Sequence, residues 1–402
     1  MTSLPQATPF DERMPPGASW TVREIAQQPD VWARVSALVQ AQTGPKDMSE
    51  PFVARCLATP GLRIVLTGAG SSAFIGQCLA PALMRHTGLR VDAVATTDLV
   101  AGPHLYFQRD VPTLLVSFAR SGSSPESVAA LELADRFVDD CQHLIFTCNP
   151  DSHLRRLAAD RANARTLLLP AETHDRGFAM TSSFTSLLLA ATQVFGLLGA
   201  GDPAAAIARA AASLLSQGLP LAQALVEQHF ERVVYLGSNE LQGLARESAL
   251  KLLELTDGRI VASHDSPLGF RHGPKTIVND RTLVVMFVSN DPYTRQYDLD
   301  LLAELRRDQR AARVLALSGQ PILGDAAAAS DDVQIEGLEA APDLALAFPC
   351  VVFAQRFALL QSMHLGLSPD NPSVSGTVNR VVRGVTIHPF LDTPAVTHVP
   401  RH

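Results

Sequence analysis

The sequence predicts an α/β protein built from two tandem, similar three-layer αβα halves, each with a parallel five-stranded sheet. The first observation is a set of five short apolar runs that recurs in one order about 169 residues later. The second is that each run is apolar nearly throughout, which is typical of strands covered on both faces. The third is that helix-length segments separate the runs, as parallel strands joined by crossovers require.

The strands are predicted from the repeat itself. "RIVLTG" begins at Arg63 and "RVVYLG" begins at Arg232, 169 residues later. The same interval separates "RVDAVATT" from "RIVASHDS" and "TLLVSF" from "TLVVMF". Two further pairs, "HLIFTCN" with "RVLALSG" and "TLLLPAE" with "VQIEGLE", are 170 and 167 residues apart. We therefore expect ten strands from a duplicated domain.

Helices are expected between these strands, for example over Pro125–Arg136 and Leu241–Glu254. The apolar stretch Leu187–Gly201 is interrupted by Thr192 and Gln193 and is too short to span a bilayer, so it is expected to be a buried helix.

The chain divides into five expected parts. These are an N-terminal helical segment over 1–49, a first domain over 50–197, a helical linker over 198–219, a second domain over 220–388 and a tail over 389–402. The linker region is rich in alanine, which favours helix. The proline-bearing ends, 1–19 and 389–402, are expected to be surface segments.

Composition excludes several classes of function. The net charge is -7 and no Lys/Arg-rich run occurs, which argues against nucleic acid and membrane partners. The five cysteines are scattered without a C-x-x-C spacing, so we expect reduced thiols and a cytoplasmic protein without a secretory signal. No group of His, Asp and Glu residues has convincing metal spacing, so no metal and no other cofactor is expected.

Hydroxyl-rich turns follow two strands of the first half. "TGAGSSAF" supplies Ser71 and Ser72, and "SFARSGSSPES" supplies Arg120 with three further serines, Ser121, Ser123 and Ser124. Ligands of open parallel sheets bind beyond the carboxyl ends of the strands. Glycines let the backbone approach an anion, and the following helix presents free N–H groups to it. The sequence therefore predicts a phosphate site.

Two other interpretations of these turns stay open. The serines can simply cap the helices that follow them. The first turn also resembles the dinucleotide fingerprint G-x-G-x-x-G, with Ala73 at the third glycine. The acidic residue that would bind a ribose is missing at the usual distance, since Asp98 lies about ten residues too late. No Walker motif is present in the sequence.

Candidate acids and bases lie mainly in the second half. Glu247, Lys251 and Glu254 share one face of a predicted helix. Glu247 and Lys251 also fit a solvated salt-bridged stripe, whereas Glu254 sits among leucines and is suited to act as a general base. His272 precedes Gly-Pro in "RHGP", a turn that leaves its imidazole available.

One more polar loop belongs to the first half. "ETHDRGFAMTSS" follows an apolar strand, and its Thr181 and Ser182 are expected to line the same cleft as the serine turns.

These motifs together resemble the double sugar-isomerase (SIS) domain proteins that act on phosphosugars. The resemblance rests on "TGAGSSAF", "ARSGSSPES", "RESALKLLE" and "GFRHGPK" and covers roughly residues 50–388. Longer matches, such as "PAETHDRGFAMTSS", "PYTRQYDLDLLAELRRD" and "SGTVNRVVRGVTIHP", are similar to the galactosamine-6-phosphate deaminase/isomerase branch. That branch implies conversion of galactosamine 6-phosphate into tagatose 6-phosphate and ammonium. The short segment before the first strand leaves no glutamine-hydrolysing domain, so release of ammonia is the expected direction.

The resemblance also implies roles for single residues. It assigns phosphate binding to Ser72, Ser121 and Ser124, with Arg120 where glucosamine-6-phosphate synthase has glutamine. It assigns proton transfer to Glu254 and ring opening to His272, which in the relatives comes from a second subunit. A homodimer or higher homo-oligomer is therefore expected.

A few implications of the resemblance remain open. A sugar-contacting lysine of the synthase corresponds here to Arg383, which leaves that role in doubt. Three other functions are also compatible with the sequence: a plain tagatose-6-phosphate ketose/aldose isomerase, a glucosamine-6-phosphate deaminase, and a non-catalytic phosphosugar sensor.

Overall fold

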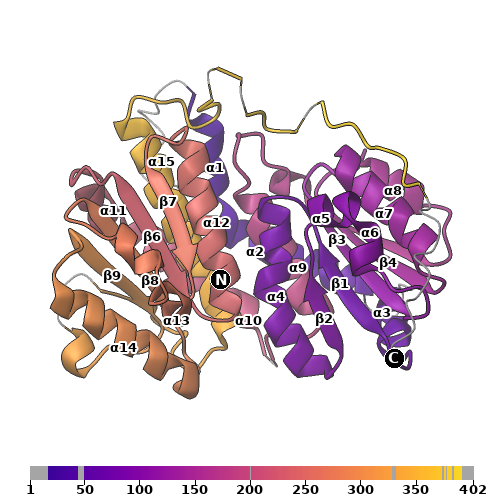
Figure 1. Cartoon of the computed structure of the whole chain (residues 1–402), viewed down its shortest axis with the longest axis horizontal. Coiled ribbons are helices and arrows are strands. Elements are labelled where there is room, and N and C mark those ends of the chain that lie inside the picture. The colour runs from indigo at the N-terminus through magenta and orange to yellow at the C-terminus, as the bar shows by residue number, and fades with distance from the viewer. Residues whose placement is uncertain are drawn as a thin grey trace, which may run out of the picture.

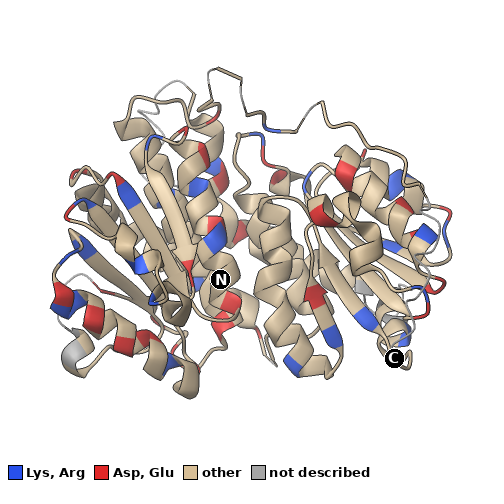
Figure 2. Ribbon diagram, in the orientation of Figure 1, with Lys and Arg blue, Asp and Glu red and all other residues tan. Residues whose placement is uncertain are grey.

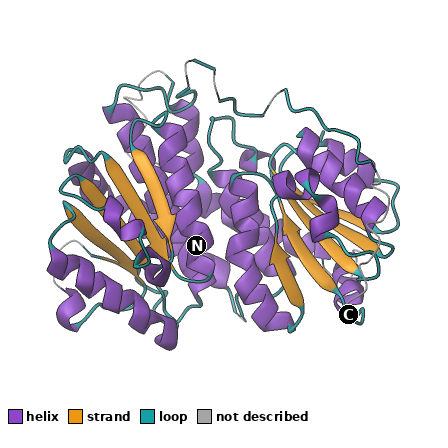
Figure 3. Cartoon of the chain, in the orientation of Figure 1, coloured by secondary structure: helices purple, strands orange, loops and turns teal. Residues whose placement is uncertain are grey.

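The computed structural model describes residues 17–43, 49–199, 201–327, 332–373, 375–376, 378–382 and 384–391. Two parallel five-stranded sheets stand side by side, and helices cover both faces of each (Figure 1, Figure 3). Charged residues lie mostly on helices and loops, and the strands carry few of them (Figure 2). The predicted fold class is confirmed.

The first sheet has the strand order β2-β1-β3-β4-β5. Its members are β1 (Arg63–Thr67), β2 (Arg90–Ala93), β3 (Thr113–Ala119), β4 (Cys141–Thr147) and β5 (Ala164–Leu168). β1 and β3 are buried at every residue, which is why their sequences are apolar nearly throughout.

The second sheet repeats this order as β7-β6-β8-β9-β10, counted from its other edge. Its members are β6 (Arg232–Gly237), β7 (Val261–Asp265), β8 (Thr282–Val288), β9 (Arg313–Ser318) and β10 (Val333–Gln334). Arg63 pairs with Thr113 in the first sheet, and Arg232 pairs with Thr282 in the second. Order and register are therefore both duplicated, and all ten predicted strands are present.

The first half contains nine described α-helices and one short 3-10 helix. They are α1 (Ser19–Ala26), α2 (Gln28–Thr43), α3 (Ser49–Leu57), α4 (Ser71–Thr87), α5 (Thr96–Ala101), α6 (Pro103–Tyr106), α7 (Pro125–Phe137), α8 (His153–Ala158), η1 (Ala171–Thr173) and α9 (Ser182–Val194). The apolar stretch predicted as a buried helix coincides with most of α9, whose residues from Ser182 to Thr192 are all buried.

The remaining helices begin with α10, in the region predicted as a helical linker, and α11, which lies almost entirely beyond it. The full set is α10 (Pro203–Gln217), α11 (Leu219–Val226), α12 (Glu240–Leu255), α13 (Pro267–Phe270), η2 (Pro274–Ile277), α14 (Pro292–Asp308), η3 (Gly324–Ala327) and α15 (Asp343–His364). α10 packs against α2 and α15, so it belongs to the core as well as connecting the halves.

Helices α4 and α12 pack against each other between the two sheets (Figure 1). A Cβ atom at Gly243 of α12 would stand 2.7 Å from the backbone nitrogen of Cys78 in α4, so the helices cross where only glycine fits. α4 follows β1 and α12 follows β6, which makes them counterparts in the duplication. Each half thus contributes one helix to the boundary.

The longest described helix, α15, is apolar on all sides. Its length and composition would allow it to cross a membrane, but 89% of the relevant segment is buried inside the protein. It packs against α10, α11 and α12, and the ring of Phe348 meets Trp32 of α2 edge-on at 5.4 Å. A helix surrounded in this way needs no polar face, so α15 is a core helix.

The described ends of the chain lie largely at the surface, as expected. Gly17 and Ser19 are exposed, whereas Ala18 is fully buried and clusters with Leu359 of α15. Beyond α15, the described residues run back over the first half (Figure 1). There Phe390 meets Phe137 edge-on at 4.9 Å and accepts a hydrogen bond from Arg136 at 2.9 Å.

Candidate active site

The turn between β1 and α4 places two hydroxyls at a helix start. Gly70 has a φ of 56°, and a Cβ atom at Gly68 would stand 2.6 Å from Ser72, so both positions need glycine. α4 begins at Ser71, and Ser71 and Ser72 are 4% and 5% exposed. The N–H groups of Ser72 and Ala73 already donate to the carbonyls of Ala69 and Gly70, so this turn offers an anion the Ser72 hydroxyl and the backbone N–H of Ser71.

A second turn lies between β3 and α7. Gly122 has a φ of 60°, and a Cβ atom there would lie 2.1 Å from Ser152 Oγ. The backbone carbonyl of Ser121 accepts from Asn149 Nδ2 at 2.9 Å, which fixes the turn from the neighbouring strand. Ser124 caps α7, because its Oγ accepts from the backbone N–H of Ser127 at 3.3 Å. The capping interpretation of Ser124 is therefore correct, although Ser124 also lines the pocket described next.

The two turns form the walls of a pocket of about 220 Å³. Glu254 of α12 lines the same pocket, with its side chain 24% exposed. Phe178 and Met180 close one side, and residues 378–382 of the segment after α15 lie over another. The pocket therefore contains groups from both halves of the chain.

A buried charge network lies behind Glu254. Lys251 Nζ donates to Ser71 Oγ at 2.9 Å and to the carboxylate of Glu254. Glu247 Oε1 lies 3.5 Å from the same nitrogen, and the side chains of Glu247 and Lys251 are both fully buried. The solvated-stripe interpretation of these two residues is therefore wrong, because α12 turns this face towards α4.

Burial controls the protonation of this network. It raises the pKa of Glu247 to about 8, with Lys251 acting in the opposite direction. Burial alone would lower the pKa of Lys251, but Glu247 and Glu254 outweigh it and the pKa is raised. Lys251 therefore stays charged and binds both Ser71 Oγ and the Glu254 carboxylate.

Arginines surround the other side of the pocket. Arg120 is 8% exposed and donates to the carbonyls of Phe178 at 3.3 Å and of Arg380 at 2.6 Å. Arg380 in turn donates through Nε to the carbonyl of Gly177 at 3.1 Å. Burial, followed by the charge of Arg120, lowers the pKa of Arg380. Two guanidinium groups and Lys251 make this region attractive to an anion.

Some predicted site residues lie elsewhere. Ser123 is exposed, and its Oγ accepts from the backbone N–H of His153 at 3.2 Å instead of lining the pocket. His272 is exposed beyond α13 and does not line the pocket either. Arg383 lies outside the described residues.

The expectation that Thr181 and Ser182 line the cleft needs correction. Both are fully buried at the start of α9, and neither lines the pocket. Thr181 Oγ1 donates to Asp175 at 3.1 Å and the backbone N–H of Ser182 donates to Asp175 at 3.0 Å. Their polar atoms are used to fold the loop that carries Phe178 and Met180, so they act on the pocket only indirectly.

Several pocket residues had no signal in the sequence. Phe178 and Met180 are apolar members of a loop that drew attention for its polar residues. Arg380 lies within "SGTVNRVVRG", where the resemblance pointed instead to Arg383. Only the return of the chain over the first half brings Arg380 to the pocket, and a tail without regular structure gives no local sign of that path.

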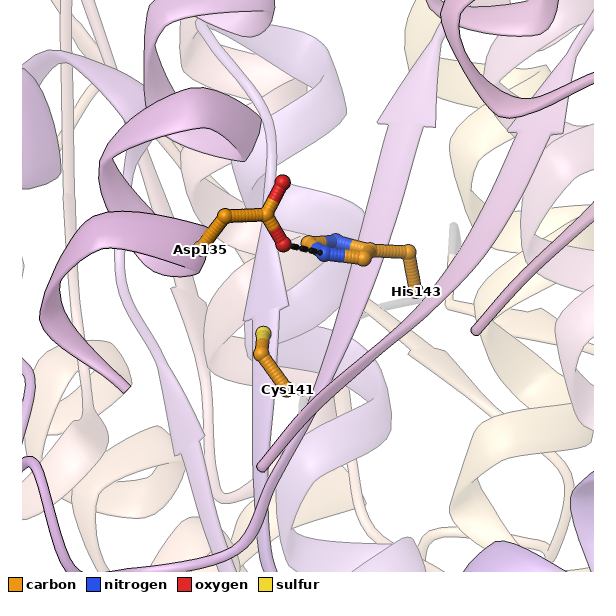
Figure 4. A group of neighbouring side chains, drawn as sticks. All are labelled: Asp135, Cys141 and His143. Atoms are coloured by element: carbon orange, nitrogen blue, oxygen red, sulfur yellow. Dashed lines mark hydrogen bonds and ion pairs between the residues drawn. The ribbon is translucent and has the colours of Figure 1, made fainter. Parts of the chain in front are cut away.

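A separate polar cluster lies on β4 and α7 (Figure 4). It combines Asp135, Cys141 and His143, three residue types that bind metals. His143 Nε2 lies 2.7 Å from Asp135 Oδ1, and Asp135 also pairs with Arg161. Burial raises the pKa of the Cys141 thiol, which keeps it protonated. The cluster is thus an ion-pair network with an inert thiol, and none of its members lines the pocket.

Comparison with known proteins places the chain in a family. The SIS domain family model matches residues 57–196. A D-galactosamine-6-phosphate deaminase of Escherichia coli is 50% identical over 375 residues, covering 92% of this chain and 96% of the relative. The protein of the same name from Shewanella sp. (strain ANA-3) is 44% identical over 378 residues, covering 93% of each chain.

A solved structure agrees with these relatives. The crystal structure of tagatose-6-phosphate ketose/aldose isomerase from Escherichia coli superimposes with a TM-score of 0.86 at 46% identity, covering 93% of this chain and 98% of that one. Likeness at this level extends over nearly the whole of both chains. The chain belongs to the SIS domain family, in the branch whose members are named D-galactosamine-6-phosphate deaminase.

Proposed function

We propose that the protein converts galactosamine 6-phosphate into tagatose 6-phosphate and ammonium. The observation that carries the proposal is one pocket containing the serine turns of the first half and Glu254 of the second. A site of this kind can hold a phosphate at one end and present a carboxylate to the sugar at the other. The names of the relatives supply the identity of the sugar.

Phosphate binding is assigned to the turns. Ser72, Ser121 and Ser124 offer hydroxyls, and the start of α4 offers the backbone N–H of Ser71. Hydrogen bonds to a charged group contribute about 1.5–3 kcal/mol each, so a few of them anchor a phosphate despite the cost of association. The guanidinium of Arg120 strengthens the field at this end of the pocket.

Proton transfer is assigned to Glu254. In the open-chain amino aldose, the carboxylate takes the proton from C2 while the aldehyde oxygen gains a proton from water, which gives an enolamine. The carboxylate then returns its proton to C1 to give an imine at C2. Water adds to the imine, and the C2–N bond breaks to leave the ketose and ammonium. Lys251 orients the carboxylate through its hydrogen bond, and the phosphate anchor keeps the carbon within reach of the base.

Ring opening is assigned to His272 from a second subunit. His272 is exposed and does not line the pocket of its own chain. The family resemblance places the corresponding residue in a partner's site, which supports a homodimer or higher homo-oligomer. The five cysteines are free and buried, which supports a reducing, cytoplasmic location.

Plain ketose/aldose isomerisation is the second candidate, because the similar solved structure bears the name tagatose-6-phosphate ketose/aldose isomerase. The two functions differ in whether ammonium leaves. Ammonium should be measured with galactosamine 6-phosphate and, in parallel, with glucosamine 6-phosphate. No ammonium from either sugar, with tagatose 6-phosphate still isomerised, would reject the deaminase in favour of the isomerase.

The role of Glu254 has its own test. The variant Glu254→Gln should lose about 10²–10⁴-fold in kcat, the usual contribution of general acid–base catalysis, while binding of the sugar phosphate changes little. Ser124→Ala is the complementary variant and should mainly raise KM. If Glu254→Gln retains wild-type kcat, the carboxylate is not the proton-transfer group.

A further inference from the structure

The duplication creates a second pocket at the counterpart of the first. It has a volume of about 490 Å³ and lies at the carboxyl ends of β6 and β8. Asn239, Glu240, Asn290 and Asp291 line it, together with Arg85 at the far end of α4. Each of these residues lies 169 positions along the sequence from a residue that lines the first pocket, and the counterpart of Arg85 is Glu254.

The backbone of the second pocket copies that of the first. Gly70 has φ 56° and ψ -128°, and its counterpart Asn239 has φ 50° and ψ -117°. A Cβ atom at Gly237 would stand 2.4 Å from Leu241, as one at Gly68 would stand 2.6 Å from Ser72. An asparagine in this left-handed conformation is unfavourable, yet the turn keeps its shape.

The chemistry of the second pocket is inverted. Ser71 is replaced by Glu240, Ser121 by Asn290, and Glu254 by Arg85. Four carboxylates line it, those of Glu240, Asp291, Glu339 and Asp343. Arg85 is the one basic residue among the described lining residues. A phosphate held as in the first pocket would meet repulsion at the helix start. The second pocket is therefore suited to a different ligand.

Two of the carboxylates are already used by the protein. Asp343 accepts from Ser289 Oγ and from the backbone N–H of Asn290, and Asp291 caps α14. Glu240 differs, since it is 8% exposed and no other described residue pairs with its carboxylate or donates a hydrogen bond to it. Burial, opposed by its own backbone N–H, raises the pKa of Glu240, and a cation beside it would relieve that cost.

Two more groups in the pocket lack partners among the described residues. Asn290 is 7% exposed, and its Oδ1 is buried without a hydrogen bond, whereas its Nδ2 donates to the carbonyls of Leu338 and Ala341. A buried acceptor left in this state costs about 1–3 kcal/mol. Arg85 is exposed on α4, and within the described chain it forms no ion pair.

We propose that this pocket is a second binding site for a small molecule that carries both a primary ammonium group and an anionic group. The ammonium would lie beside the carboxylate of Glu240, and the anion would bind Arg85. Amino-sugar phosphates have this combination of charges. The proposed reaction supplies only the choice of probe, because the ligand class follows from the groups in the second pocket.

The test is calorimetric titration of the Glu254→Gln protein, which binds without turnover. Galactosamine 6-phosphate should bind with two equivalents per chain, and galactose 6-phosphate, which lacks the ammonium, with one. Adding Arg85→Ala should remove one equivalent of the amino sugar, and Glu240→Gln should weaken that equivalent by about tenfold or more. The control is His86→Ala, the next residue on α4, which is exposed and does not line the pocket.

The outcomes separate this inference from the proposed function. If the Glu254→Gln protein binds one equivalent of galactosamine 6-phosphate, and this binding persists after both Arg85→Ala and Glu240→Gln, the second site is overturned and the proposed reaction stands. One equivalent that Arg85→Ala removes would support the second site and count against galactosamine 6-phosphate as substrate. Two equivalents unaffected by either substitution would overturn the second site, and no binding at all would overturn both proposals.

Discussion

Glu24 provides a test of how the pocket wall is supported. Its carboxylate is 4% exposed and accepts the backbone N–H groups of Arg176 and Gly177, at the base of the loop that carries Phe178 and Met180. Burial, followed by the neighbouring carboxylate of Asp175, raises the pKa of Glu24 from 4.5 to about 8. The folded protein therefore holds a proton on Glu24 that the unfolded chain gives up.

The size of the effect follows from this difference. Because the pKa is raised on folding, the stabilisation is complete below pH 4.5 and is lost as the pH rises to about 8. A shift of 3.5 units corresponds to a loss of up to about 4.8 kcal/mol in the free energy of unfolding. The variant Glu24→Gln keeps an acceptor for the two N–H groups and does not titrate, so it should escape this loss.

Urea denaturation at pH 5, 6.5 and 8 would measure the free energies of unfolding of both proteins. We expect them to be similar at pH 5, and the variant to become the more stable one by several kcal/mol at pH 8. Glu172→Gln is a matched control, because that side chain is 45% exposed and should show no such trend. A constant difference between wild type and Glu24→Gln at all three pH values would refute the reasoning.

Three further substitutions test other parts of the structure. Lys251→Met should destabilise the protein by about 3–5 kcal/mol at pH 9, because the buried Glu247 loses the cation that offsets the cost of its burial. Adding Glu247→Leu should restore most of that loss in urea denaturation, and no recovery would contradict the pairing. Gly122→Ala would place a Cβ atom 2.1 Å from Ser152 Oγ, so the KM for galactosamine 6-phosphate should rise about tenfold or more. An unchanged KM would show that this turn does not hold the phosphate. Asn239→Gly should stabilise the protein by about 1 kcal/mol by relieving its positive φ, and a lower melting temperature would instead show that the side chain is needed.

The fold was predictable because the duplication leaves two copies of the same signal. Apolar runs such as "RIVLTG" and "TLVVMF" are strongly marked by burial on both faces, and their repeated spacing indicates the same set of strands twice. The helix predicted over Leu241–Glu254 is observed over Glu240–Leu255, since its apolar period is long and regular. These are properties of the local sequence.

The site was predictable in part for a different reason. Carboxyl ends of neighbouring parallel strands meet at one edge of a sheet, so Ser72 and Ser121 had to lie close together. Nothing local distinguishes a buried Glu–Lys pair from a solvated one, so the state of Glu247 and Lys251 depended on the packing of α12 against α4. The arrival of Arg380 at the pocket likewise depends on tertiary structure alone.

The crossing of α4 and α12 has a consequence for how such a protein can evolve. Each pocket is lined by residues from the beginning of one of these helices and from the end of the other. Neither copy of the domain therefore contains a complete pocket by itself. In a symmetric pair of identical chains, any replacement at one cavity would appear in the other as well. Joining the copies in a single polypeptide removes that constraint, and a carboxylate can face the substrate on one side while an arginine occupies the equivalent position on the other.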